Sequence, residues 1–266
     1  MKKFPLLVAS AVIVWVLAAC SNPNTQEPND SIPTSPIAQP TISPSDSQSQ
    51  TSVIEPTPEV VSSPDAELPS SAPSSVQSAA LAVAEGLQVR GRSADTNYSR
   101  EAFGTPWKDV DRNGCDTRND ILKRDFTTST FKSGTGNCKV IGGTWTDPYS
   151  NESYTFFEAP SGAQIDHVVS LKNAWQMGAD VWSDQMRVEF ANDPLNLRVT
   201  IASINRAKSD ANAASWLPPY KPGRCNFIAT QVAVKAKWSL YVTEAEKQVF
   251  ISILSKPECQ LTNLPN

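Results

Sequence analysis

The stretch QIDHVVSLKNAW, residues 164–175, holds the one histidine of this 266-residue chain, His167, directly after Asp166. Residues 163–169 have the pattern of a strand, and a helix is expected to follow over residues 171–177. An imidazole beside a carboxylate can be a working pair, or an ordinary polar step in a sheet. The polar residues that follow in the chain favour the first interpretation.

Asn196, Asn205 and Lys208 can join the histidine and its neighbour. A short strand is expected over residues 195–199 and a short helix over residues 203–208, so a strand, a loop and a helix can bring a carboxylate, an imidazole and an amide oxygen around one point. A neutral imidazole accepts a proton from water near physiological pH, and carboxylate and amide oxygens suit a cation such as Mg²⁺. Hydrolysis of a phosphodiester requires groups of these types.

These residues resemble the HNH, or ββα-metal, endonucleases, in which a strand carries Asp-His, a later turn an Asn, and the next helix a final His or Asn. Further stretches are similar to an exported branch related to the C-terminal domain of GmrSD-type restriction enzymes: NYSREAFG, DRNGCDTRNDILKRD, ANDPLNL and SINRAKSDANAASWLPP. The resemblance covers about residues 87–259 and rests on the order and spacing of these motifs.

The resemblance implies a role for each residue of the set. His167 would be the general base, Asp166 and Asn205 the metal ligands, and Asn196 the brace of the loop that aims the histidine. Lys208 would contact a phosphate or stabilise the transition state, although a solvated helix end explains it equally well. Because the last metal position is an asparagine rather than a histidine, Mg²⁺ is favoured over Zn²⁺, with Mn²⁺ and Ca²⁺ as alternatives.

A second polar run, CDTRNDILKRDF (residues 115–126), reads as a short helix that Asp116 starts, with its apolar residues facing inward. Asp116 and Arg118, together with Asp120, either line the cleft, with the guanidinium on a phosphate, or form a buried ion network. Arg206 is a further candidate for substrate binding. Five tryptophans are expected in the core rather than as platforms for bases: Trp145, Trp175, Trp182, Trp216 and Trp238.

The first twenty residues have the layout of a secretory signal, and LAAC at residues 17–20 resembles a bacterial lipobox in which Cys20 would be lipidated. An uncleaved anchor helix is the alternative. Residues 21–77 contain eleven prolines and are rich in Ser, Thr, Gln and Asn, a composition typical of a disordered tether. Residues 78–266 are then expected to form one HNH-type nuclease domain.

Four more cysteines follow in the chain: Cys115, Cys138, Cys225 and Cys259. An even number in an exported protein indicates two disulfides, for which three pairings are possible. Order along the chain favours Cys115 with Cys138 and Cys225 with Cys259. The chain has no C-x-x-C pair, which argues against a structural zinc site or a thioredoxin-like redox site.

The other predicted elements complete an α+β domain, in which a small ββα motif lies within a mainly helical surround. We expect a helix over residues 79–89, a hairpin of residues 140–145 and 154–157, a helix from the cap Ser183 to residue 191, and helices over residues 225–241 and 243–256. Thr243 and Glu246 form a capping box, and a two-residue joint would make the last two helices antiparallel.

Charge is compatible with a polyanionic substrate but does not argue for one. Residues 1–87 hold eight acidic side chains and two lysines, so the remainder is slightly basic within an overall net charge of −4.

We expect an exported, monomeric endonuclease that cleaves DNA, or RNA as well, with little sequence preference, and that touches a membrane only through its lipid. The rival is a non-catalytic surface module that binds nucleic acid or a protein. An S-x-x-K at residues 129–132 lacks its companion motifs, and no G-x-S-x-G seats a serine hydrolase triad.

Overall fold

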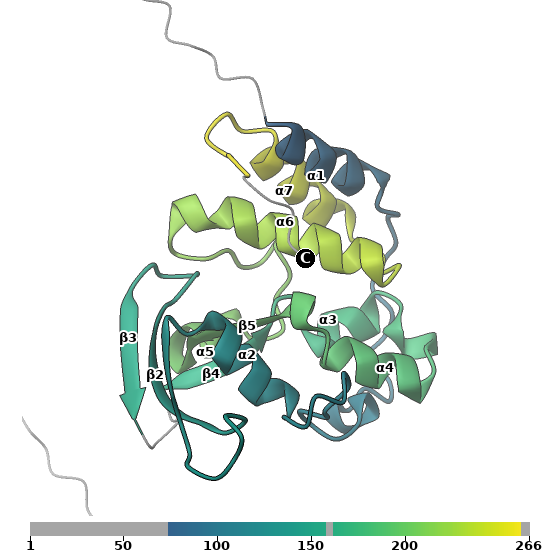
Figure 1. The fold of residues 1–266 in the computed structure, drawn as a ribbon. Coiled ribbons are helices and arrows are strands. Elements are labelled where there is room, and N and C mark those ends of the chain that lie inside the picture. The colour runs from purple at the N-terminus through teal and green to yellow at the C-terminus, as the bar shows by residue number, and fades with distance from the viewer. Residues whose placement is uncertain (1–73, 158–161, 262–266) are drawn as a thin grey trace, which may run out of the picture. The chain divides into compact units, whose positions relative to one another are not determined.

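The structure is a computed structural model that describes residues 74–157 and 162–261 (Figure 1). The expected secretory signal, the lipidation at Cys20 and nearly all of the expected tether lie outside the described residues. Helices and two small antiparallel sheets make up the described part, which confirms the α+β class. Within that part, every helix is too short or too polar to cross a membrane.

The elements follow one another in this order: α1 (Ser75–Gly86), η1 (Arg100–Phe103), α2 (Thr117–Asp125), β1 (Thr128–Phe131), β2 (Val140–Thr146), β3 (Ser153–Phe157), β4 (Ala163–His167), α3 (Leu171–Gln176), η2 (Ala179–Val181), α4 (Asp184–Ala191), η3 (Pro194–Asn196), β5 (Leu197–Ile201), α5 (Ala202–Lys208), η4 (Lys221–Gly223), α6 (Arg224–Lys237) and α7 (Glu244–Leu254). The η elements are single 3₁₀ turns.

Helices α1, α6 and α7 pack together as one helical layer (Figure 1). Their apolar faces bury Ile228, Phe250 and Leu254 completely. The first helix begins earlier than expected, because the Ser74 hydroxyl caps α1 and also donates to the carbonyl of Leu261. The boundary expected between residues 77 and 78 therefore falls inside α1.

The expected two-residue joint between the last two helices is wrong. Helix α6 ends at Lys237 and α7 begins at Glu244, so six residues connect them. Within this connection Ser239 has a φ of 52°, and Val242 forms a parallel bridge with Val89. The chain therefore leaves the helix in order to pair with the segment that follows α1.

A three-stranded antiparallel sheet in the order β1-β2-β3 packs against α2. Asp116 caps α2 through the backbone N–H of Asn119, as the sequence indicated. The β2–β3 hairpin was expected from the sequence, but β1 was not. A side chain at Gly143 would place its Cβ 2.3 Å from the carbonyl oxygen of Thr128, so close pairing of β1 with β2 requires glycine there.

The unit that carries the histidine is a two-stranded sheet followed directly by a helix. Strands β4 and β5 are antiparallel, with His167 opposite Leu197, and α5 starts at the residue after β5. Successive side chains of a strand point to opposite faces, so Gln164 and Asp166 share one face of β4. Helix α5 packs on that face, because Asn205 and Lys208 bond to these two side chains.

Both disulfides have the expected partners. Cys115 is bonded to Cys138, which ties the start of α2 to the loop between β1 and β2. Cys225 is bonded to Cys259, which ties the start of α6 to the segment after α7. Each bond therefore joins two elements at their ends.

Candidate active site

The imidazole of His167 is held in one orientation at the end of β4. Its Nε2 lies 2.9 Å from the carbonyl oxygen of Ala191, and the side chain is 7% exposed. Because a carbonyl oxygen can only accept, Nε2 carries the hydrogen and Nδ1 keeps its lone pair. Trp107 stacks on the ring with centroids 6.3 Å apart and planes inclined by 17°. The result is an oriented imidazole with one basic nitrogen.

The surroundings of His167 keep the ring neutral. Burial lowers the pKa of His167 from 6.5 to about 4, and the positive charges of Arg100 and Lys208 act in the same direction. The hydrogen bond to Ala191 opposes this shift but is the smaller effect. The imidazole is therefore in its base form at neutral pH.

The carboxylate of Asp166 is buried and bonded at both oxygens. Oδ1 accepts from Nζ of Lys208 at 2.8 Å, and Oδ2 accepts from the hydroxyl of Tyr149 at 2.8 Å. Burial raises the pKa of Asp166, while the charge and hydrogen bonds of its two partners act against that rise. The aspartate is thus held in place as half of a buried ion pair.

The side chain of Lys208 does not lie where it could contact a phosphate. Its side chain is 0% exposed, and Nζ also donates to the backbone oxygen of His167 at 2.7 Å. The lysine is near the end of α5, on the face of that helix that packs against β4. Its ammonium therefore braces Asp166 and the backbone of the histidine, and is not presented to a substrate in this structure.

Asn196 fixes the chain directly after the histidine. Its side chain is 0% exposed, accepts from the N–H of Val169 at 2.8 Å, and donates to the carbonyl of the same residue at 3.1 Å. The backbone oxygen of Asn196 accepts from the N–H of Val168. These three bonds connect the turn before β5 to the segment after β4.

A cleft of about 280 Å³ brings the key groups together. His167, Asp166 and Asn205 all line it, and Arg100 and Arg206 lie in the same lining. The Asn205 amide donates from Nδ2 to Gln164, so its oxygen is not used in that bond. The carboxylate, imidazole and amide that are distant in sequence thus share one cleft.

The oxygen donors of this cleft fit a small hard cation in their chemistry. Mg²⁺ is usually held by one or two carboxylates and several waters, which is the kind of set that Asp166 and Asn205 would supply. Within residues 74–157 and 162–261, no three His, Cys, Asp or Glu side chains gather closely enough to hold a metal by themselves.

The acidic and basic residues around α2 lie outside the cleft lining. Asp116 is exposed and serves as the helix cap, and Arg118 donates to the carbonyl of Ala163, at the other end of β4 from the histidine. Burial, together with the negative charges of nearby aspartates, raises the pKa of Asp120. These residues match neither the expected cleft wall nor a buried ion network.

Three neighbours of the site were missed in the sequence: Arg100, Trp107 and Tyr149. Arg100 belongs to NYSREAFG, a stretch similar to the exported branch, but nothing in the stretch singles out its guanidinium. Trp107 stacks on a histidine sixty residues later, and Tyr149 lies in the turn between β2 and β3. Only the tertiary structure shows these contacts.

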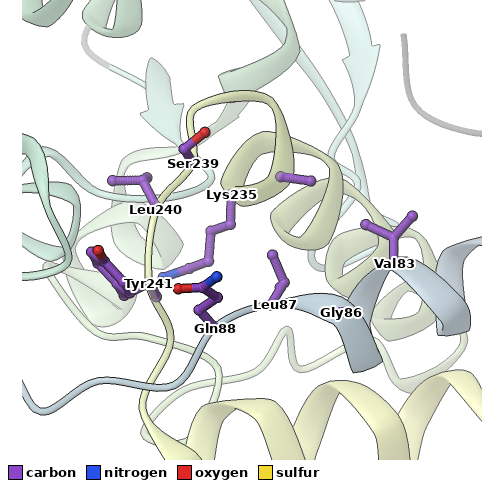
Figure 2. Close-up of a pocket in the computed structure, with 9 residues that line it drawn as sticks. Val83, Gly86, Leu87, Gln88, Lys235, Ser239, Leu240 and Tyr241 are labelled. Atoms are coloured by element: carbon purple, nitrogen blue, oxygen red, sulfur yellow. Dashed lines mark hydrogen bonds between the residues drawn. The ribbon is translucent and has the colours of Figure 1, made fainter.

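A second cavity, of about 450 Å³, lies apart from His167, between the end of α1 and the turn after α6 (Figure 2). Its buried charge is Lys235, which is paired with Glu246 and also bonds to Asn173 and to the carbonyl of Tyr241. Because that ammonium already has its partners, this cavity lacks the reactive groups of the histidine cleft.

The fold and the cleft define a small α+β domain in which a histidine, an aspartate and an asparagine line one cleft. Residues 116–253 match the family described as GmrSD restriction endonucleases, C-terminal domain, and the chain belongs to that family. A relative described as an uncharacterized secreted protein, from Arthroderma benhamiae, is 36% identical over 180 residues, which are 67% of this chain and 84% of the relative. No solved structure matches the chain.

Proposed function

We propose that this protein is an exported endonuclease that hydrolyses phosphodiester bonds of DNA with low sequence specificity, and RNA is the alternative substrate. One observation carries the proposal: the oriented, neutral His167 shares a cleft with Asp166 and Asn205, in a chain of an endonuclease family. A module that only binds nucleic acid or protein would not need a basic nitrogen held beside two oxygen donors.

In the proposed reaction, Nδ1 of His167 takes a proton from the water that attacks phosphorus. The carbonyl of Ala191 holds the hydrogen on Nε2, so the correct nitrogen faces the water. Trp107 fixes the plane of the ring. Asn196 sets the backbone that follows the histidine through its bonds to Val169.

Asp166 and Asn205 would hold a divalent cation, for which the donor chemistry favours Mg²⁺. When bound, such a cation neutralises charge on the phosphate and on the leaving oxygen. Lys208 is a positioning residue in this proposal, because its buried ammonium holds the carboxylate of Asp166 rather than the substrate. Lys208 thus fixes Oδ1 of the aspartate and the hydroxyl of Tyr149 fixes Oδ2, while the carboxylate lines the cleft.

The proposed place of action is outside the cell. Two disulfides form and persist in oxidising compartments, and a 36% identical relative is described as secreted. We propose that Cys20 carries a lipid that anchors the monomeric protein, and that nucleic acid is its partner. Low specificity is proposed because arginines at the cleft can contact the sugar-phosphate backbone, which carries no sequence information.

The direct test is cleavage of plasmid DNA by the purified full chain, with Mg²⁺, Mn²⁺, Ca²⁺ or EDTA, beside single-stranded RNA. We expect nicked and then linear DNA with Mg²⁺, and intact DNA with EDTA. Plasmid and RNA that both stay intact with every cation would refute the nuclease proposal. Binding without cleavage under those conditions would favour the non-catalytic module.

A further inference from the structure

We infer that Arg100, which precedes the family-matched residues 116–253, binds a phosphate of the substrate beside the histidine. This inference rests on the proposed nuclease function and adds a specific substrate contact to it. Arg100 was not among the site residues expected from the sequence. Its segment is joined to the site only by the fold.

Arg100 is close to the imidazole in two ways. It lines the 280 Å³ cleft together with His167 and Asn205, and it also lines a small hollow of about 30 Å³ together with His167 and Trp107. The arginine therefore borders the reactive ring rather than a distant surface.

The side chain of Arg100 is exposed, and within residues 74–157 and 162–261 its guanidinium forms neither a hydrogen bond nor an ion pair. Other arginines of the domain are used within the fold: Arg124 donates to the carbonyl of Leu197, and Arg187 to that of Ala102. Arg206, also in the cleft lining, resembles Arg100 in being exposed. A guanidinium that borders a polar cleft and bonds to no other group of the protein is available to bind an anion.

The turn that carries Arg100 is firmly anchored. Phe103, in the same turn, is buried and packs against Phe190. The carbonyl of Ala102 accepts from Nε of Arg187, and the hydroxyl of Ser99 caps the turn. The backbone at Arg100 is therefore positioned by α4 and by the aromatic core, so the guanidinium is presented from a fixed base.

A phosphodiester is the ligand that this arrangement fits. A guanidinium offers a planar pair of N–H donors that matches two phosphate oxygens, which a lysine ammonium cannot reproduce. The cleft lining also contains Arg206 and the exposed Asp210, while the charges of Asp166 and Lys208 cancel each other, so the two arginines leave one net positive charge. An anionic backbone lying in the cleft would thus meet two arginines beside the base.

The test compares Arg100→Ala and Arg100→Lys with Arg92→Ala, an exposed arginine outside the cleft lining. Binding of a fluorescent DNA duplex to the full chain is measured by anisotropy in EDTA at several salt concentrations, and KM and kcat are measured with Mg²⁺. For Arg100→Ala we expect Kd and KM to rise about 10- to 100-fold, the usual effect of losing a charged hydrogen bond. The slope of log K against log salt should fall by about 1.

We expect Arg100→Lys to recover the salt slope but only part of the affinity, and Arg92→Ala to stay within about twofold of wild type. Circular dichroism and the melting temperature check that each variant folds. A folded Arg100→Ala protein with wild-type KM and salt slope overturns the inference and leaves the nuclease proposal intact. A wild-type chain that neither binds nor cleaves nucleic acid overturns both.

Discussion

At the scale of single residues, burial decides what each group of the cleft can do. His167 is neutral because it is removed from water, and Asp166 can be buried because Lys208 is buried with it. Lys208 was expected at a solvated helix end or on a phosphate. It is buried instead, because a carboxylate without a partner is costly in the interior. The buried pair in turn fixes the strand that carries the imidazole.

The depressed pKa of His167 makes a prediction for stability against pH. Between about pH 6.5 and 4 the unfolded chain binds a proton that the folded imidazole refuses, so the free energy of unfolding falls as pH drops through this window. The loss should reach about 3 kcal/mol, since each pKa unit corresponds to about 1.4 kcal/mol. Urea unfolding of wild type and His167→Gln at pH 7.5 and 4.5 measures it. An identical pH dependence in both proteins would contradict the neutral, buried ring.

Lys208→Met should destabilise the protein by about 3 kcal/mol or more at pH 7, because it leaves the carboxylate of Asp166 buried without a counter-charge. Adding Asp166→Asn should recover most of that loss, since the second change removes the charge itself. Chemical denaturation of both variants is the measurement. A single variant that loses less than about 1 kcal/mol would mean that the lysine is not a structural partner.

Sequence spacing could predict the residues that are close in the chain but not their distant neighbours. His167, Asn196 and Asn205 belong to a strand, a turn and a helix in one continuous stretch, so the sequence indicated that they can meet, and the resemblance to the HNH endonucleases gave them their roles. Arg100 lines the same cleft and Trp107 stacks on His167, and both come from a segment that precedes the histidine by sixty residues or more. No pattern in that segment shows which element it packs against.

At the scale of elements, helix starts were predicted better than helix ends. Asp116, Ser183 and Thr243 each cap the helix that the sequence assigned to them, because a cap acts on the next few residues only. Helix α6 ends four residues early, where a long-range bridge between Val242 and Val89 takes over. Strand β1 was missed because it has only four residues, and these are exposed or half-buried and show no clear hydrophobic pattern.

The turn η1 depends on Gly104, which has a φ of 80° and a ψ of −168°. A Cβ at this position would lie 2.5 Å from Cγ2 of Val188, so Gly104→Ala should cost about 2 kcal/mol and shift the turn that carries Arg100. Gly91→Ala is the matched control, because nothing lies within 4 Å of its added Cβ. Thermal melts and KM for DNA test this, and equal effects of the two changes would refute it.

At the scale of the whole molecule, the two disulfides hold the ends of packed elements together. The class and the cysteine pairing could be predicted from composition and chain order. The packing of other elements around β4, β5 and α5 could not be predicted, because it depends on aromatic contacts between distant segments, such as Phe103 with Phe190.

Removal of the second disulfide tests the helical layer. Cys225 and Cys259 are 34 residues apart, so Cys225→Ser with Cys259→Ser should lower the free energy of unfolding by about 3 kcal/mol. Cleavage at 25 °C should persist, because neither cysteine lines the cleft of His167. The double variant should melt below the oxidised wild type, and the reduced wild type, which also loses the Cys115–Cys138 bond, should melt lower still. A double variant with the same melting temperature as the oxidised wild type would show that the Cys225–Cys259 bond does not stabilise the helical layer.

The most direct test of His167 as the general base is the cleavage rate of His167→Ala at saturating Mg²⁺ and DNA, with and without added imidazole. We expect the rate to fall about 100- to 10,000-fold, the usual contribution of a general base, while Mg²⁺ binding and folding are retained. Free imidazole should restore part of the rate, because the variant leaves space between Trp107 and Ala191. A folded variant that cleaves within about threefold of the wild-type rate would contradict the role of His167.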